Sequence, residues 1–140
     1  NMAVVMTGYS SDNVLMHNSI IDGEFIRYNK KGDTINLYAA FDIYYVNNKS
    51  VRELGFVSSE IDDVKDSYRH PILIKCISSL NIKSILDTND PTYNSCHFRL
   101  QMKTFYQGGA SRSIFEGCNK ILSSVKNGLF EYNTDGLIFT

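Results

Sequence analysis

Two neighbouring stretches of the chain, residues 19–28 and 35–46, hold short apolar runs that are rich in aromatic and β-branched side chains. This composition is typical of β-strands. The sequence KKGD at 30–33 predicts a hairpin connection between the two strands, and the Asp-Gly pair at 22–23 predicts a bend within the first. The Asn pair at 47–48 is expected to end the second strand.

Three other stretches predict strands. Short apolar runs over 3–7 and 14–17 lie on either side of a turn-rich segment, and residues 97–105 alternate imperfectly between apolar and polar. The sequence NDP at 89–91 predicts a turn. Because the strands of the first half follow one another closely, they favour an antiparallel meander.

Helical signals begin after Phe56. Ser59 is followed three residues later by Asp62, a spacing that can cap a helix start. Pro71 is expected to separate that turn from a second helix over residues 72–80, because proline interrupts the hydrogen bonds of a helix interior.

A third helix is expected after the glycine pair at 108–109. Ser113 and Glu116 form a capping-box signature, and the Asn-Gly pair at 127–128 is a typical helix end. The apolar residues between these signals recur at helical spacing, so this helix is expected to pack on a sheet. They are Ile114, Phe115, Cys118, Ile121 and Leu122. The predicted fold class is therefore α+β, dominated by antiparallel sheet.

The composition is ordinary for a globular domain of 140 residues, with 43% hydrophobic and 21% charged residues. A net charge of −1 gives no global electrostatic case for nucleic-acid binding. The three cysteines form no CxxC pair, which favours a reducing intracellular setting, and no apolar run approaches a membrane span. Because the chain ends inside the apolar run LIFT, we expect it to be an internal fragment.

Three short motifs place acidic residues beside apolar, strand-like runs. They are Asp-Gly-Glu at 22–24, Phe-Asp at 41–42 and Asp-Gly at 135–136. Each has a structural explanation when taken alone. The first is a turn or bulge, the second a buried aromatic strand, and the third a turn entering a core strand. Together, in this order, they could also supply carboxylates and an aromatic face to a nucleotide pocket.

The three motifs resemble those of the covalent nucleotidyltransferases, the superfamily of mRNA capping enzymes and ATP-dependent polynucleotide ligases. The segments FDIYYVNNKSVRELGF, FRLQMKTFY and IFEGCNKIL extend the similarity to the guanylyltransferase domains of large nucleocytoplasmic DNA viruses. The resemblance covers the chain from about Ile20 to its end. It implies an ATP-grasp-like nucleotidyltransferase fold, of which residues 1–140 are expected to be the central part.

The resemblance implies roles for four residues. Glu24 would lie near the ribose and a divalent metal ion, Mg²⁺ or Mn²⁺, and Asp135 would help to place that ion. Phe41 would stack on the base, and Lys103 would contact the purine. A lysine ammonium can only donate, so it favours the O6 acceptor of guanine and therefore GTP. The structural alternative for Lys103 is a solvated strand lysine.

The reaction that the resemblance implies is mRNA capping. A lysine attacks the α-phosphate of GTP, pyrophosphate leaves, and GMP passes to the diphosphate end of RNA. The nucleophile motif of the family, Lys-x-Asp-Gly, is absent from these 140 residues, and KKGD is better explained as a hairpin turn. The nucleophile motif would lie upstream and an OB-fold domain downstream, so the chain by itself is expected to be inactive.

The expected partners are GTP, an RNA 5′ end and other capping domains, with no membrane, in the host cytoplasm or the virion. An ATP-dependent DNA or RNA ligase is the alternative within the superfamily. A non-catalytic nucleotide-binding or scaffold module would also explain the missing lysine. Arg52 and Arg69 could meet phosphate or RNA, but structural ion pairs are the simpler interpretation.

Overall fold

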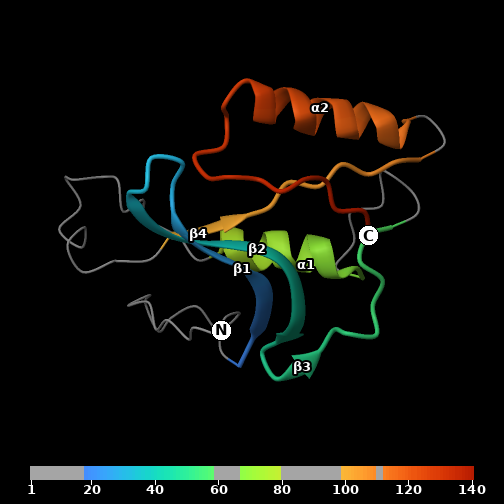
Figure 1. Ribbon diagram of the computed structural model, residues 1–140. Helices are drawn as coiled ribbons and strands as arrows, with labels where there is room; N and C mark the ends of the chain where they lie inside the picture. The colour runs from blue at the N-terminus through green and yellow to red at the C-terminus, as the bar shows by residue number, and fades with distance from the viewer. Residues whose placement is uncertain (1–17, 59–66, 80–98, 110–111) are drawn as a thin grey trace.

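The computed structural model describes residues 18–58, 67–79, 99–109 and 112–140 (Figure 1). The strands predicted over 3–7 and 14–17, the helix start at Ser59 and the turn at 89–91 lie outside the described residues. Within the described ranges the chain forms one sheet of four strands and two helices, an α+β arrangement. The predicted fold class is confirmed at this level.

The first two strands form the predicted hairpin. β1 (Ile20–Tyr28) pairs antiparallel with β2 (Thr34–Val46), and the turn between them contains Gly32 at a φ of 89°. The side-chain oxygen of Asn29 organises this turn, because it accepts hydrogen bonds from the backbone N–H groups of Lys31 and Asp33, both at 2.9 Å.

The bend predicted at 22–23 is a β-bulge in the partner strand. Asp22 pairs with Asp42 but Gly23 pairs with Ala40, so Phe41 is an extra residue opposite the Asp-Gly pair. A bulge shifts the alternation of faces by one residue. Ala40 and Ile43 therefore both reach the same buried core although they are three positions apart.

The other edge of β2 holds two short strands. The Asn pair at 47–48 ends β2 as predicted, and it does so in a tight turn with φ values of 48° and 66°. β3 (Lys49–Ser50) then returns antiparallel. β4 (Arg99–Met102) pairs parallel with residues 37–40 of β2. β4 therefore lies outside the meander predicted for the first half of the chain, because a parallel neighbour must enter by a long connection.

Helix α1 (Arg69–Ser78) covers one face of the sheet, where Leu73 and Cys76 join Ala40 and Ile43 in the main core. Figure 1 shows α1 crossing behind the sheet. Pro71 was predicted to precede this helix. It lies instead in the first turn of the helix. Proline is tolerated there because the N–H groups of a first turn have no partner within the helix.

The opposite face of β2 carries Leu37 and Ala39, which are also buried. The C-terminal segment 129–140 runs over this face, between the sheet and α2 (Ile114–Lys126) (Figure 1). Its Glu131 is held at two points. The carbonyl accepts the N–H of Lys30 at 2.8 Å, and the carboxylate pairs with Arg99 at 2.6 Å.

Both predicted ends of α2 are confirmed. The Ser113 hydroxyl caps the helix by accepting the N–H of Phe115, and Gly128 ends it with a φ of 69°. The predicted packing of α2 on a sheet is wrong, because the C-terminal segment occupies the space between them. Phe115 and Leu122 stay exposed, and Gly117 is the buried residue of the helix, close against Tyr106.

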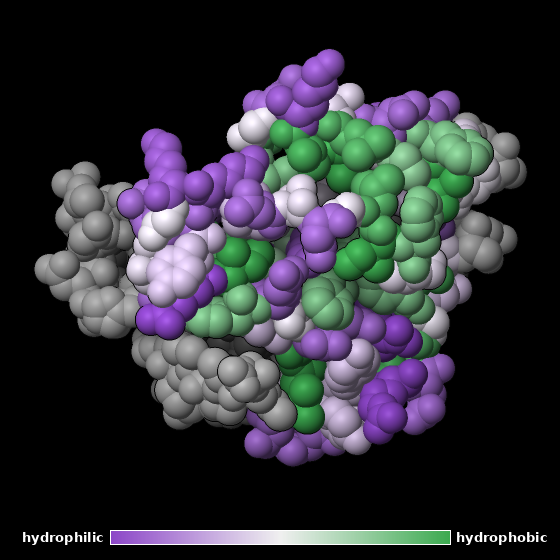
Figure 2. Space-filling view, in the orientation of Figure 1, coloured by the Kyte–Doolittle hydropathy of each residue, from purple (hydrophilic) through white to green (hydrophobic). Residues whose placement is uncertain are grey.

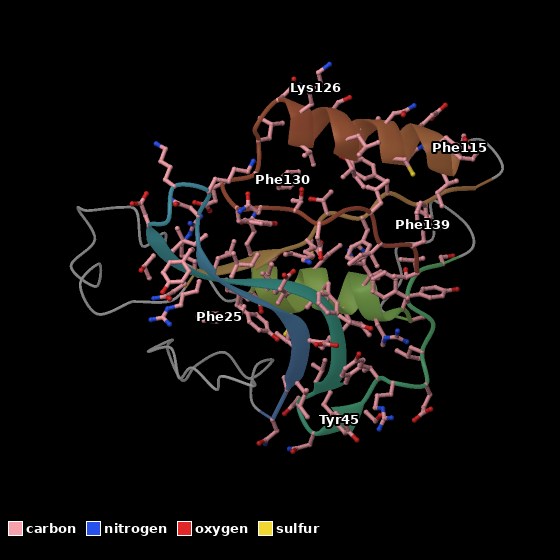
Figure 3. All side chains as sticks on the ribbon, in the orientation of Figure 1. Phe25, Tyr45, Phe115, Lys126, Phe130 and Phe139 are labelled. Carbon is pink, nitrogen blue, oxygen red and sulfur yellow. The ribbon has the colours of Figure 1, made fainter. Side chains whose placement is uncertain are left out.

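The apolar run at 137–139 forms no strand, so the predicted core strand after Asp135 is also wrong. Ile138 and Phe139 are exposed, and in the view of Figure 3 Phe139 lies below the first turn of α2. Figure 2 shows hydrophobic side chains gathered over this end of α2 and the adjoining segment. Side chains of this run therefore contribute apolar surface rather than a strand of the sheet.

Candidate functional site

Three of the four residues proposed for nucleotide binding meet on the face of β2 that faces the C-terminal segment. The Lys103 ammonium forms an ion pair with Glu24, with 2.6 Å between Nζ and Oε2. The same nitrogen lies 5.5 Å from the centre of the Phe41 ring, within cation–π range. Residues that are distant in the sequence thus form one cluster, which we call the Glu24–Phe41–Lys103 cluster.

The sheet explains this convergence. Glu24 is opposite Ala39 on one side of β2, and Lys103 directly follows β4 on the other, with its N–H donating to the carbonyl of Ala40 at 2.8 Å. The two side chains therefore reach each other across β2. Phe41 is the bulged residue between them. Bulges re-aim a side chain and are common beside functional sites.

Gly23 shapes the strand next to Glu24. A Cβ at this position would come within 2.5 Å of the Tyr38 ring and 2.9 Å of the Ala39 carbonyl, so the close approach of the two strands requires glycine. Asp22 is committed to the same bend, since its carboxylate accepts the Tyr44 hydroxyl and the Gly23 N–H, each at 2.9 Å. Asp22 and Gly23 thus have structural roles, whereas the side chain of Glu24 takes part in the cluster.

Tyr132 lies beside the cluster, and sequence reasoning did not identify it. Burial raises the pKa of its phenol most strongly, Lys103 lowers it, and Glu24 and Glu131 raise it. The hydroxyl therefore stays protonated at neutral pH and can donate a hydrogen bond. Tyr132 packs on Phe130, with ring centres 5.9 Å apart, and Figure 3 shows Phe130 between α2 and the sheet. In the sequence nothing distinguishes Tyr132 from eight other tyrosines.

The fourth proposed residue, Asp135, is exposed on the C-terminal segment. Within the described ranges, no hydrogen bond or ion pair joins it to Glu24, Phe41 or Lys103. Its predicted role beside the α-phosphate therefore stays a prediction.

The second residue of the Phe-Asp motif has a structural role. Asp42 is buried and forms a bidentate ion pair with Arg69, with 2.9 Å to Nε and 3.1 Å to Nη2. The backbone N–H of Ile43 adds a hydrogen bond of 2.8 Å. The Asp42 side chain raises the pKa of Arg69 further, chiefly through their hydrogen bonds. The structural ion pair expected for Arg69 is confirmed.

Coordination of Mg²⁺ or Mn²⁺ was expected from Glu24 and Asp135. An ammonium 2.6 Å from the Glu24 carboxylate repels a divalent cation, so a metal ion on Glu24 would have to displace Lys103. In the part of the chain that the structure describes, no three His, Cys, Asp or Glu residues group as metal ligands. Metal binding by these two residues stays a prediction.

Comparison with known proteins yields no relative: the chain matches no protein-family model, no curated protein and no solved structure. No helix in the described ranges combines the length and the apolar character needed to cross a membrane.

Proposed function

We propose that this chain is the nucleotide-binding part of an mRNA guanylyltransferase, and that the Glu24–Phe41–Lys103 cluster binds the base of GTP. The observation that carries the proposal is the contact of Lys103 with both other residues, 2.6 Å from the Glu24 carboxylate and 5.5 Å from the Phe41 ring centre. The motif resemblance named these three residues separately. Their meeting across three strands supports a shared ligand.

The chemistry of the cluster suits a guanine base. The ring of Phe41 offers a stacking surface, and Lys103 supplies a donor for the O6 acceptor. A purine on Phe41 would replace the present cation–π contact with stacking, while the ammonium moves to the edge of the base. The pair is accessible for this exchange, since the side chains of Lys103 and Glu24 are 24% and 56% exposed.

The proposal assigns nucleotide binding to this chain, and not the covalent step. The lysine that takes up GMP in the family stands in a Lys-x-Asp-Gly motif, which these residues lack. Transfer of GMP would therefore need a nucleophile that the motif does not provide here.

Equilibrium dialysis of the protein with labelled GTP and ATP tests the proposal. We expect GTP to bind more tightly than ATP, and Lys103→Met to weaken GTP binding by about tenfold, the effect of losing one good contact to a base. Phe41→Leu should weaken binding of both nucleotides, because stacking does not distinguish them. Lys126→Met, an exposed lysine at the end of α2, is the matched control. Preference for ATP would point to ligase-type chemistry, and absence of binding would overturn the proposal.

A further inference from the structure

We infer that Glu24 contacts the base itself, and that Glu24 and Lys103 together distinguish guanine from other purines. This differs from the place near the ribose and the metal ion that the resemblance implies for Glu24. The inference rests on the proposed function, because it concerns the ligand of the same cluster.

The Glu24 carboxylate lies where the edge of a bound base would be. Its Oε2 is 2.6 Å from the Lys103 ammonium, and that ammonium is 5.5 Å from the centre of the Phe41 ring. A purine stacked on Phe41 would take the place of the ammonium over the ring and move it to the edge of the base. The carboxylate, which is held directly beside the ammonium, would then lie at the same edge.

The donors and acceptors of Lys103 and Glu24 match those on the edge of guanine. A lysine ammonium only donates and a carboxylate only accepts. Guanine presents the O6 acceptor next to two donors, N1–H and the N2 amino group, so its edge matches an ammonium beside a carboxylate. Adenine presents only the N6 amino group as a donor next to the N1 acceptor. Guanine therefore forms one hydrogen bond more with the same pair.

The Glu24 carboxylate can accept further hydrogen bonds. The contact of Glu24 with Lys103 uses Oε2, and within the described ranges Oε1 accepts no hydrogen bond. Both oxygens together can accept N1–H and the N2 amino group in a bidentate manner. The Glu24 side chain is 56% exposed, so a ligand can reach it. The ion pair with Lys103 can persist while the base binds, which keeps the two groups in register.

The test compares wild type with Glu24→Gln, an isosteric change that keeps one acceptor and removes the charge. Binding of GTP, ITP, ATP and 2′-deoxy-GTP is measured in EDTA, so that metal coordination does not contribute. ITP lacks the N2 amino group, and 2′-deoxy-GTP lacks the ribose hydroxyl. Glu53→Gln, at an exposed position beyond β3, is the matched control.

We expect Glu24→Gln to weaken GTP binding about tenfold and to narrow the difference between GTP and ITP, since one bidentate base contact is lost. The ratio of GTP to 2′-deoxy-GTP should stay unchanged. If GTP binds but Glu24→Gln alters only that ratio, or nothing, the inference is overturned while the proposed function stands. If wild type binds no GTP in EDTA or in magnesium, both are overturned.

Discussion

Two ion pairs join the β1–β2 hairpin to later elements, and they differ in geometry and exposure. Asp42 and Arg69 form a bidentate pair, with side chains only 12% and 19% exposed, and Arg69 also donates to the carbonyl of Leu54. Glu24 and Lys103 share one contact, with 56% and 24% exposed. The first pair fixes the start of α1, together with the loop that follows β3, to the sheet. The second leaves acceptor and donor capacity for a ligand.

The choice of cation fits this division. The planar guanidinium of arginine matches a carboxylate at two points, and it loses little by being desolvated. A lysine ammonium is a flexible point charge that can exchange one partner for another. The structure therefore separates a pair that holds the fold from a pair suited to binding, and the two can be tested against each other.

Breaking the Asp42–Arg69 pair should have the largest effect on stability. Arg69→Met leaves the buried Asp42 carboxylate with a single backbone donor, and we expect the free energy of unfolding to fall by about 3 kcal/mol. Urea denaturation measures the change, with Lys126→Met as the control for losing an exposed cation. A loss below about 1 kcal/mol would show that this pair is as weak as a surface pair.

Protonation of His70, in the aromatic cluster beside Arg69, should have a smaller effect on stability, and this effect depends on pH. His70 lies between Phe56 and Phe105, with ring centres 5.4 and 5.0 Å away, and its Nε2 is buried without a hydrogen-bond partner in the described part of the chain. Burial lowers the pKa of His70, and Asp42 partly opposes this. The unfolded chain, with a histidine pKa of about 6.5, therefore binds the proton more readily than the folded protein.

Stability should consequently decrease as the pH falls from 7 to 5.5, because protonation favours the unfolded state in that range. His70→Phe keeps the aromatic packing and removes the titrating group, so its urea midpoint should depend less on pH. The difference in slope between the two proteins isolates His70 from the other two histidines of the chain. If the urea midpoints of both proteins depend equally on pH, a group other than His70 causes the effect.

The extent to which sequence predicted the fold depends on the range of the interactions. The turn at Gly32, the cap at Ser113 and the stop at Gly128 were predicted correctly, because each depends on a few adjacent residues. The parallel pairing of β4 was not, since it depends on residues about sixty positions apart. The apolar run at 137–139 carries the composition of a strand, but strand formation needs a neighbouring edge for its hydrogen bonds.

The candidate site shows the same division. Asp-Gly at 22–23 predicted a bend, but the bulge that places Phe41 opposite it follows from the register of two strands. The contact between Glu24 and Lys103 spans 79 positions, and only the family resemblance named both residues in advance. Tyr132 reaches the cluster because Glu131 is held by Arg99 and Lys30, and none of these contacts leaves a local pattern in the sequence.

Breaking the Glu24–Lys103 pair should have the smallest effect on stability. Lys103→Met keeps an aliphatic side chain at this position and removes one contact of a half-exposed pair, so we expect the free energy of unfolding to change by less than about 1 kcal/mol. The same variant should lose GTP affinity, whereas Arg69→Met should lose stability first. Urea denaturation and dialysis on both variants measure the two effects separately. A destabilisation of Lys103→Met as large as that of Arg69→Met would make the cluster part of the scaffold, and its exposure would then need another explanation than ligand binding.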